Sequence, residues 1–139
     1  MYPAEMVLPL KQELVNAGFT SLSTSHEVEN ILNSGKEETV MVVINSVCGC
    51  AARNARPAAI QAAHTSGKKP SQFTTVFAGF DSEAVARARQ YMLPYPPSSP
   101  AIALFKNGKL VHMIERHNIE GRPAELIAEN LVAAFDEYC

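Results

Sequence analysis

Apolar residues occur along this chain in two patterns, short runs and stripes with helical spacing. The runs at 40–44, 73–78 and 101–105 are rich in β-branched or aromatic residues, which predicts a strand at each. The run at 40–44 contains no polar residue, as is typical of a strand buried on both faces. A shorter stretch at 19–22 predicts a strand at the edge of the sheet.

A hairpin is predicted between residues 101 and 115. Asn107 and Gly108 separate the run at 101–105 from a second apolar stretch at 110–115. Asn-Gly between two such runs is the strongest short-range signal for a tight β-turn. The preceding loop, LPYPPSSP, is dense in proline and cannot continue a helix.

Helical stripes predict two helices before the central run. The first, over 4–17, ends at Gly18, and the second begins at a capping box formed by Thr24 and Glu27 and ends at Gly35. Their inward-facing residues are expected to be Met6, Val7, Leu10, Leu14 and Val15 in the first helix, and Val28, Ile31 and Leu32 in the second.

Three more helices follow the central run. An alanine-rich segment at 51–64 predicts one, a second over 83–92 begins at Asp81 or Ser82, and Pro123 opens the last. The inward stripe of the last helix is expected to be Leu126, Ile127, Asn130, Leu131, Ala134 and Phe135. The alternation of strands and helices indicates an α/β fold, and the length indicates a single domain, residues 1–139.

Two cysteines lie where the central strand passes into the alanine-rich helix. Cys48 and Cys50 therefore stand at the carboxyl end of a buried strand and at a helix N-terminus, where unpaired N–H groups and the helix dipole stabilise a thiolate. No Asp or Glu occurs from Thr39 to Phe80, whereas four basic residues do. Cys48 is nearer the helix start and is the expected nucleophile.

Composition narrows the class of protein. The chain is 47% hydrophobic and 19% charged, as expected for a globular protein, and its net charge of −2 predicts no binding to nucleic acid. No apolar stretch predicts a membrane span or a secretion signal, so the expected compartment is the cytoplasm. Cysteines there are kept reduced, which favours a catalytic or metal-binding use over a structural disulfide.

The order of elements and the position of the thiols resemble the thioredoxin fold, a mixed central sheet flanked by helices, here with an N-terminal helical extension. In that fold a cis proline precedes the hairpin and faces the thiols, and Ser99-Pro100 matches it by position. Pro57 matches the proline of the redox helix. The segments MYPAEMVLPLKQELVNAGF, VINSVCGCAARNARP, FAGFD and SSPAIALFKNGKLVHMIERHNIEGR are similar to those of the bacilliredoxins.

This resemblance implies a thiol–disulfide oxidoreductase that removes bacillithiol from mixed disulfides on client proteins. The catalytic residues would be Cys48 and Cys50, with no bound cofactor and bacillithiol as the thiol substrate. Bacillithiol carries a malate group, whose carboxylates suit a basic rim of Arg53, Asn54 and Arg56. Together with that rim, Ser99 and Pro100 would also contact substrate.

Three alternatives remain open at this stage. The thiols could belong to a general disulfide isomerase, because the one-residue spacer closes a small ring that is easily reduced. They could be unreactive core thiols. They could also form part of a metal-binding or thiol-carrier module. The further metal ligands would then come from His26, His64, His112, His117 or Cys139, but the expectation is that the chain has no metal site. Cys139 is otherwise expected to lie in a frayed terminus and to take no part in the chemistry. The alternative is a role as resolving cysteine or in an intermolecular disulfide.

Overall fold

The strand β2 (Thr39–Asn45) is the central strand of the sheet, and all of its residues are buried. The computed structural model describes residues 1–33, 37–65 and 67–139. Because side chains alternate along a strand, Met41 contributes to one hydrophobic layer and Val42 to the other. The prediction of a strand buried on both faces is confirmed.

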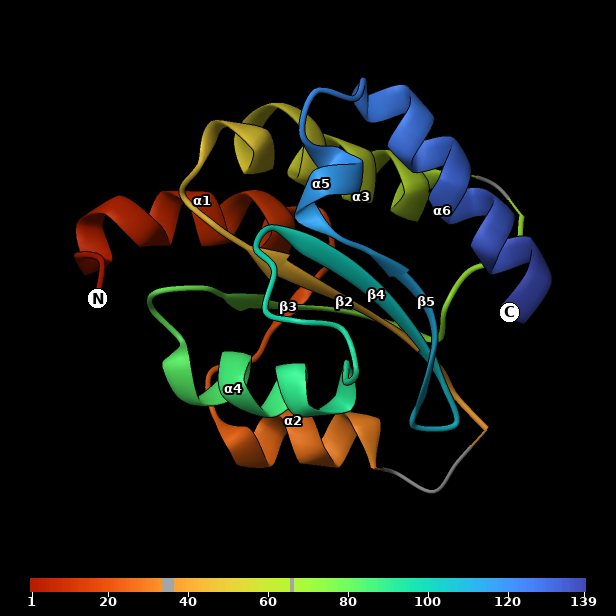
Figure 1. Cartoon of the computed structure of the whole chain (residues 1–139), viewed down its shortest axis with the longest axis horizontal. Helices are drawn as coiled ribbons and strands as arrows, with labels where there is room; N and C mark the ends of the chain where they lie inside the picture. The colour runs from red at the N-terminus through yellow and green to blue at the C-terminus, as the bar shows by residue number, and fades with distance from the viewer. Residues whose placement is uncertain (34–36, 66) are drawn as a thin grey trace.

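Four further strands complete a mixed sheet: Thr20–Ser21 (β1), Gln72–Phe77 (β3), Ala101–Lys106 (β4) and Lys109–Ile114 (β5). Their order is β1–β3–β2–β4–β5 (Figure 1). The strands β1 and β2 run parallel to β3, whereas β4 is antiparallel to both β2 and β5. It follows that β2 and β5 run in the same direction, so that their carboxyl ends meet at one edge of the sheet.

Helices cover both faces of this sheet (Figure 1). One face carries α1 (Ala4–Asn16), a π-helical turn η1 (Ala51–Ala55), α3 (Arg56–His64), α5 (Arg116–Ile119) and α6 (Ala124–Tyr138), and the other carries α2 (Ser25–Leu32) and α4 (Ser82–Tyr91). The predicted α/β architecture with an N-terminal helical extension is confirmed.

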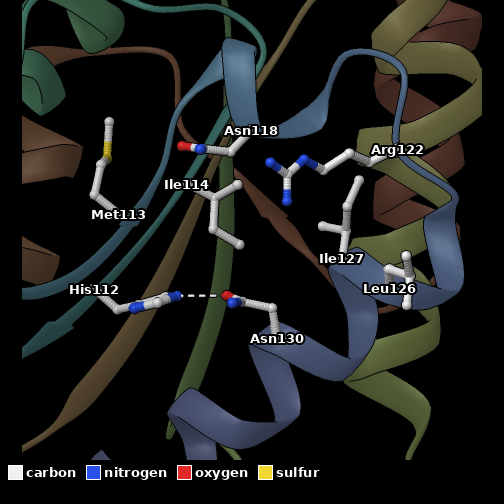
Figure 2. A pocket seen from close by; sticks show the side chains of 8 residues that line it. All are labelled: His112, Met113, Ile114, Asn118, Arg122, Leu126, Ile127 and Asn130. Atoms are coloured by element: carbon white, nitrogen blue, oxygen red, sulfur yellow. Dashed lines mark hydrogen bonds between the residues drawn. The ribbon is translucent and has the colours of Figure 1, made fainter.

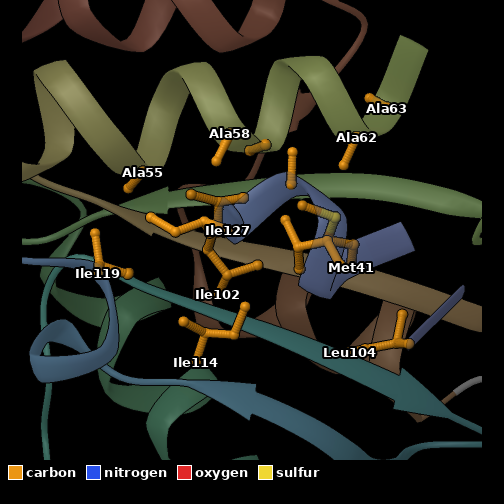
Figure 3. Close-up of a cluster of buried hydrophobic side chains, with 14 of the residues drawn as sticks. Met41, Ala55, Ala58, Ala62, Ala63, Ile102, Leu104, Ile114, Ile119 and Ile127 are labelled. Atoms are coloured by element: carbon orange, nitrogen blue, oxygen red, sulfur yellow. The ribbon is translucent and has the colours of Figure 1, made fainter. Parts of the chain in front are cut away.

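Small residues let the helices of the first face lie close to the sheet (Figure 3). Ala58 and Ala62 of α3 are fully buried in a cluster that also holds Met41, Ile102 of β4 and Ile127 of α6. A short methyl side chain brings the backbone of α3 close to its neighbours, and larger residues from the sheet and α6 fill the remaining space. The alanine-rich segment that follows the thiols is thus packed closely between the sheet and α6.

The turn predictions are confirmed. Asn107 and Gly108 have φ values of 53° and 75°, as a tight hairpin turn requires, and Gly18 after α1 also has a positive φ, of 101°. Thr24 and Glu27 form the predicted capping box. The predicted end of the second helix at Gly35 lies outside the described residues.

The prediction of one regular helix over 51–64 is wrong in its first turn. The N–H of Arg56 donates to the carbonyl of Ala51, five residues back, which makes η1 a π-helical turn. Pro57 follows at once. A proline has no N–H, and its ring would clash with the carbonyl four residues earlier, so the wider turn accommodates it.

Several expected helix details also differ. Asp81 precedes α4, but its carboxylate accepts from the N–H of Phe77 and pairs with Lys11 at 3.1 Å rather than capping the helix through its side chain. Met6, Val15, Leu126 and Asn130 were expected to face inward and are exposed. Only one narrow stripe of each helix meets a neighbour, so these residues remain on its outer side.

Candidate active site

Cys48 and Cys50 lie in the short loop between the end of β2 and η1. The N–H groups of Ala51 and Ala52 donate to the carbonyl of Cys48, at 3.1 and 3.2 Å, so that the loop passes directly into the helical turn. Cys48 is half-buried, while Cys50 is only 8% exposed. The thiol that meets solvent is therefore the one nearer the strand.

The two thiols lie in contact with each other. Their Sγ atoms are 2.7 Å apart, and both cysteines are free. The hydroxyl of Ser46 lies 3.2 Å from the Sγ of Cys48. A thiolate on Cys48 would thus receive hydrogen bonds from the Ser46 hydroxyl and from the Cys50 thiol.

These surroundings shift the pKa values of the two cysteines in opposite directions. Burial alone would raise the pKa of Cys48, but hydrogen bonds from Cys50, Ser46 and the Ala51 N–H, together with the charge of Arg116, lower it below the ordinary value. Burial raises the pKa of Cys50, and its hydrogen bond to Cys48 and the charge of that sulfur raise it further. Of the two thiols, Cys48 is therefore the one that loses its proton first as the pH rises.

Arg116, at the start of α5, is the cation that acts on both thiols, and the sequence analysis did not identify it. Its main-chain N–H donates to the Ser98 hydroxyl at 2.7 Å, and its guanidinium donates to the Ser99 carbonyl at 3.3 Å. The available signal was topological. A residue just after a strand parallel to β2 reaches the same sheet edge as the residues that follow β2.

Ser99 and Pro100 lie in the loop immediately before β4, which also contains Ser98. The Ser99–Pro100 bond is cis, as the resemblance to the thioredoxin fold predicted. The structure contains a second cis bond that the sequence analysis did not predict, between Leu93 and Pro94. Whether Ser99 and Pro100 bind substrate stays a prediction.

Arg53 lies against the backbone between the two cysteines. A Cβ atom added to Gly49 would come within 2.6 Å of the Arg53 guanidinium, so the missing side chain at 49 leaves room for that group. Arg53 is itself exposed. Of the three residues expected on a basic rim, it is the one whose charged group lies exposed beside the thiol loop.

The other two members of the predicted rim have different positions. Arg56 is only 1% exposed, and the prediction that it faces substrate is wrong because α1 and β2 enclose it. The Asn54 side chain is half-buried and donates to the carbonyl of Arg122, which ties η1 to the segment before α6.

The buried Arg56 connects three elements beneath the thiols. Its guanidinium donates at 2.9 Å to the side-chain oxygen of Asn45 and at 2.9 Å to the carbonyl of Ser46, and it pairs with Glu13 of α1 at 3.3 Å. Asn45 also accepts from the Ser46 N–H and donates to the carbonyl of Leu10. These contacts hold Ser46 in position, and Ser46 in turn contacts Cys48.

Cys139 lies at the far end of the sheet from the thiol pair. Cys139 lies near the side chain of Thr39, the first residue of β2, whereas Cys48 follows the last residue of that strand. Seven residues of strand span about 20 Å. Cys139 therefore cannot resolve a disulfide on Cys48 within one molecule.

A metal site was the rival interpretation of the thiols. In the part of the chain that the structure describes, no group of three or more His, Cys, Asp or Glu residues lies close enough together to hold a metal ion. None of the helices described there is both long and apolar enough to cross a membrane.

Comparisons with known proteins agree with this geometry. Residues 2–139 match the model of a family described as "Disulphide isomerase". The chain is 57% identical over 137 residues to a bacilliredoxin of Cytophaga hutchinsonii, covering 99% of each chain. It is 52% identical over 138 residues to a bacilliredoxin of Geobacillus kaustophilus, covering 99% of this chain and 94% of that one.

Solved structures of similar shape include thioredoxins. Thioredoxin of Schistosoma mansoni matches with a TM-score of 0.60 and 19% identity, covering 88% of this chain and 97% of that one. Thioredoxin of Fasciola hepatica matches with a TM-score of 0.56 and 16% identity, covering 87% and 100%. At this identity the likeness shows the fold, which is that of thioredoxin.

Proposed function

The chain belongs to the bacilliredoxin family of thiol–disulfide oxidoreductases, and from this premise we propose that it removes bacillithiol from mixed disulfides on client proteins. One observation carries the proposal: two thiols 2.7 Å apart have pKa values shifted in opposite directions. Such a pair provides one nucleophilic thiol and one resolving thiol. The nucleophile takes the small thiol from the client, and the resolving thiol then releases it.

In the first step the Cys48 thiolate attacks the bacillithiol sulfur of the mixed disulfide. A new S–S bond forms between Cys48 and bacillithiol, the old one breaks, and the client leaves as a thiolate that takes a proton from water. The lowered pKa of Cys48 favours the thiolate, and the partial exposure of this side chain provides access.

In the second step Cys50 releases bacillithiol. In the reduced protein, the negative charge of Cys48 and the hydrogen bond that Cys50 donates to it both raise the pKa of Cys50. Once Cys48 is part of a disulfide, it carries no negative charge and no longer accepts that hydrogen bond. Arg116 still lowers that pKa, so Cys50 loses its proton more readily than before. Its attack on Cys48 forms an intramolecular disulfide and expels bacillithiol, and a further small thiol or a reductase then restores both thiols.

The groups around the thiols suit an anionic small thiol. Arg116, which also pairs with Glu120 at 3.3 Å, and Arg53 are exposed guanidinium groups beside the site, and guanidinium pairs well with the carboxylates of a malate group. An open hollow of about 490 Å³ adjoins Arg116 and is lined in part by Ser98 and Ser99. No bound cofactor is required, because the chain, the client's mixed disulfide and the small thiol provide every reacting sulfur, and a reduced cytoplasm would keep the resting thiols free.

The first prediction tests the assigned roles by intact mass spectrometry of the reduced protein mixed with a bacillithiolated client. The unmodified chain should remove bacillithiol from the client. Cys50→Ala should complete the first transfer and accumulate a Cys48–bacillithiol disulfide, whereas Cys48→Ala should leave the client unchanged. An active Cys48→Ala with an inactive Cys50→Ala would reverse the roles, and a client that stays bacillithiolated in every mixture would refute the proposal.

A general disulfide isomerase is the second candidate, and the description of the matching family model favours it. An isomerase would rearrange wrongly paired disulfides in a client that carries no bacillithiol. Incubating the reduced protein with a scrambled multi-disulfide client, and measuring regained client activity, separates the two functions.

A further inference from the structure

A second concave site lies among β5, α5 and α6 and includes neither the thiols nor Arg116. It is a pocket of about 240 Å³ between β5, α5 and α6 (Figure 2). Its apolar wall includes Ile114 and Ile127, and Leu126 stands at its rim. Polar groups enter it from three different elements, which is the usual composition of a small-molecule site.

The polar groups of this pocket are hydrogen-bond donors. The Asn118 side-chain oxygen accepts from the Glu115 N–H at 3.2 Å, which leaves the NH₂ of that amide available. The Asn130 side-chain oxygen accepts from the His112 Nε2 at 2.7 Å, so the Asn130 NH₂ is available as well. The Arg122 guanidinium points into the pocket in Figure 2.

Negative charge is missing from this site. No Asp or Glu lines the pocket, and among the described residues no carboxylate lies within ion-pair distance of Arg122. An unpaired guanidinium beside two amide NH₂ groups matches the lone pairs of a carboxylate. The apolar wall between these donors matches a short carbon chain.

We propose that this pocket binds a small carboxylate-bearing molecule, with Arg122 pairing its carboxylate and Asn118 and Asn130 donating further hydrogen bonds. The site does not depend on thiol chemistry, so it stands apart from the proposed removal of bacillithiol. Two sources share the required chemistry. One is a free dicarboxylate, and the other is the malate group of bacillithiol, which would then pair with Arg122 in place of Arg116 and Arg53 and which rests on the proposed function.

The test is a titration of the reduced, isotope-labelled protein with succinate and L-malate, followed by amide chemical shifts. Millimolar dicarboxylate should shift the amides of residues 112–114, 118, 122 and 126–130. Arg122→Gln should weaken binding about tenfold, equivalent to roughly 1.4 kcal/mol. Lys109→Gln is the matched control, because it removes one positive charge from β5 outside the pocket, and it should change the affinity less than about twofold.

S-methylated bacillithiol distinguishes the two sources, since it carries the malate carboxylates but cannot exchange disulfides. Binding about tenfold tighter than malate, with shifts that extend from the pocket to Cys48, supports the bacillithiol source. Equal affinity with shifts confined to the pocket supports a free dicarboxylate. Shifts that avoid the pocket, or equal losses in Arg122→Gln and Lys109→Gln, would overturn the proposal whether or not bacillithiol removal is observed.

Discussion

At the scale of single residues, the thiol pair shows how a few hydrogen bonds divide one chemistry between two cysteines. Cys48 and Cys50 are separated by a single residue, yet only Cys48 has the Ser46 hydroxyl at 3.2 Å. Burial acts against a negative charge on both sulfurs. The difference between them therefore depends on which sulfur receives hydrogen bonds as a thiolate.

The second prediction concerns Ser46. Removing its hydroxyl in Ser46→Ala should raise the pKa of Cys48, so the thiolate fraction below that pKa falls and the acidic limb of the pH–rate profile moves to higher pH. Loss of one hydrogen bond to a charged group should slow attack at about pH 6 by roughly tenfold. Thiolate absorbance and bacillithiol release, each measured against pH, check this.

Ser82→Ala is a suitable control for Ser46→Ala, because Ser82 is exposed at the start of α4 on the opposite face of the sheet. It should leave both profiles in place. Identical profiles for Ser46→Ala and the unmodified protein would contradict a hydrogen bond to the Cys48 thiolate.

The third prediction couples Gly49 to Arg53. In Gly49→Ala the new methyl group would occupy the space of the Arg53 guanidinium, which is the mobile end of a long side chain and can move away. The fold should persist, while turnover of an anionic thiol falls about as far as in Arg53→Gln. Both changes remove the same contact, the one between the Arg53 guanidinium and the anionic thiol. The double variant should therefore be no slower than either single variant. Additive losses in steady-state kinetics would show that the two residues act separately.

At the scale of elements, the buried Arg56 connects α1, β2 and the start of α3. It donates to the Ser46 carbonyl and pairs with Glu13, so its charge is partly neutralised where α1 covers it. A buried charge of this kind holds elements in a defined arrangement more than it adds net stability. The segment that carries the thiol pair is thereby attached to the N-terminal helix.

The fourth prediction concerns this connection. Arg56→Met leaves the Ser46 carbonyl without its buried donor and should lower the free energy of unfolding by about 1–3 kcal/mol. Because Ser46 is then less firmly held, the pKa of Cys48 should also rise, which loss of stability alone would not cause. Urea unfolding followed by circular dichroism, and thiolate titration of the folded variant, measure the two effects.

The exposed Arg53→Met provides the comparison for Arg56→Met, since it removes the same group from the same segment. Its unfolding free energy should change by no more than about 0.5 kcal/mol. Equal stability losses in the two variants would argue against a structural role for the buried guanidinium.

At the scale of the whole molecule, the sheet separates the cysteines into two sites. The residues after β2 and β5 meet at one sheet edge, where the thiols and Arg116 lie. Cys139 contacts Thr39 at the other end of β2. The length of one strand thus keeps the terminal thiol out of the exchange reaction.

The fifth prediction follows from that separation. Cys139→Ser should leave the rate of bacillithiol release unchanged within about twofold. Burial raises the pKa of the Cys139 thiol, so its thiolate fraction at neutral pH is small, whereas the pKa of Cys48 is lowered. Iodoacetamide at neutral pH should therefore alkylate Cys48 before Cys139, as peptide mass mapping would show. Prior labelling of Cys139 would contradict the assigned environments.

Local patterns in the sequence were sufficient for the strands, the hairpin and the position of the thiols. A buried strand needs an apolar run, Asn-Gly specifies a tight turn, and Thr24 and Glu27 specify a helix start, and each of these signals depends on neighbours only a few residues away. The placement of Cys48 and Cys50 at a strand-to-helix junction is equally local.

The tertiary structure alone decided which charged groups meet the thiols. Arg53 and Arg56 stand three residues apart in one basic segment, yet only Arg56 points under α1, so one is exposed and the other buried. Arg116 reaches the site because the order and direction of the strands bring the ends of β2 and β5 together. The sequence by itself determined where the two paired thiols occur, and long-range packing determined the charges around them, because those charges come from segments that are adjacent only in the folded chain.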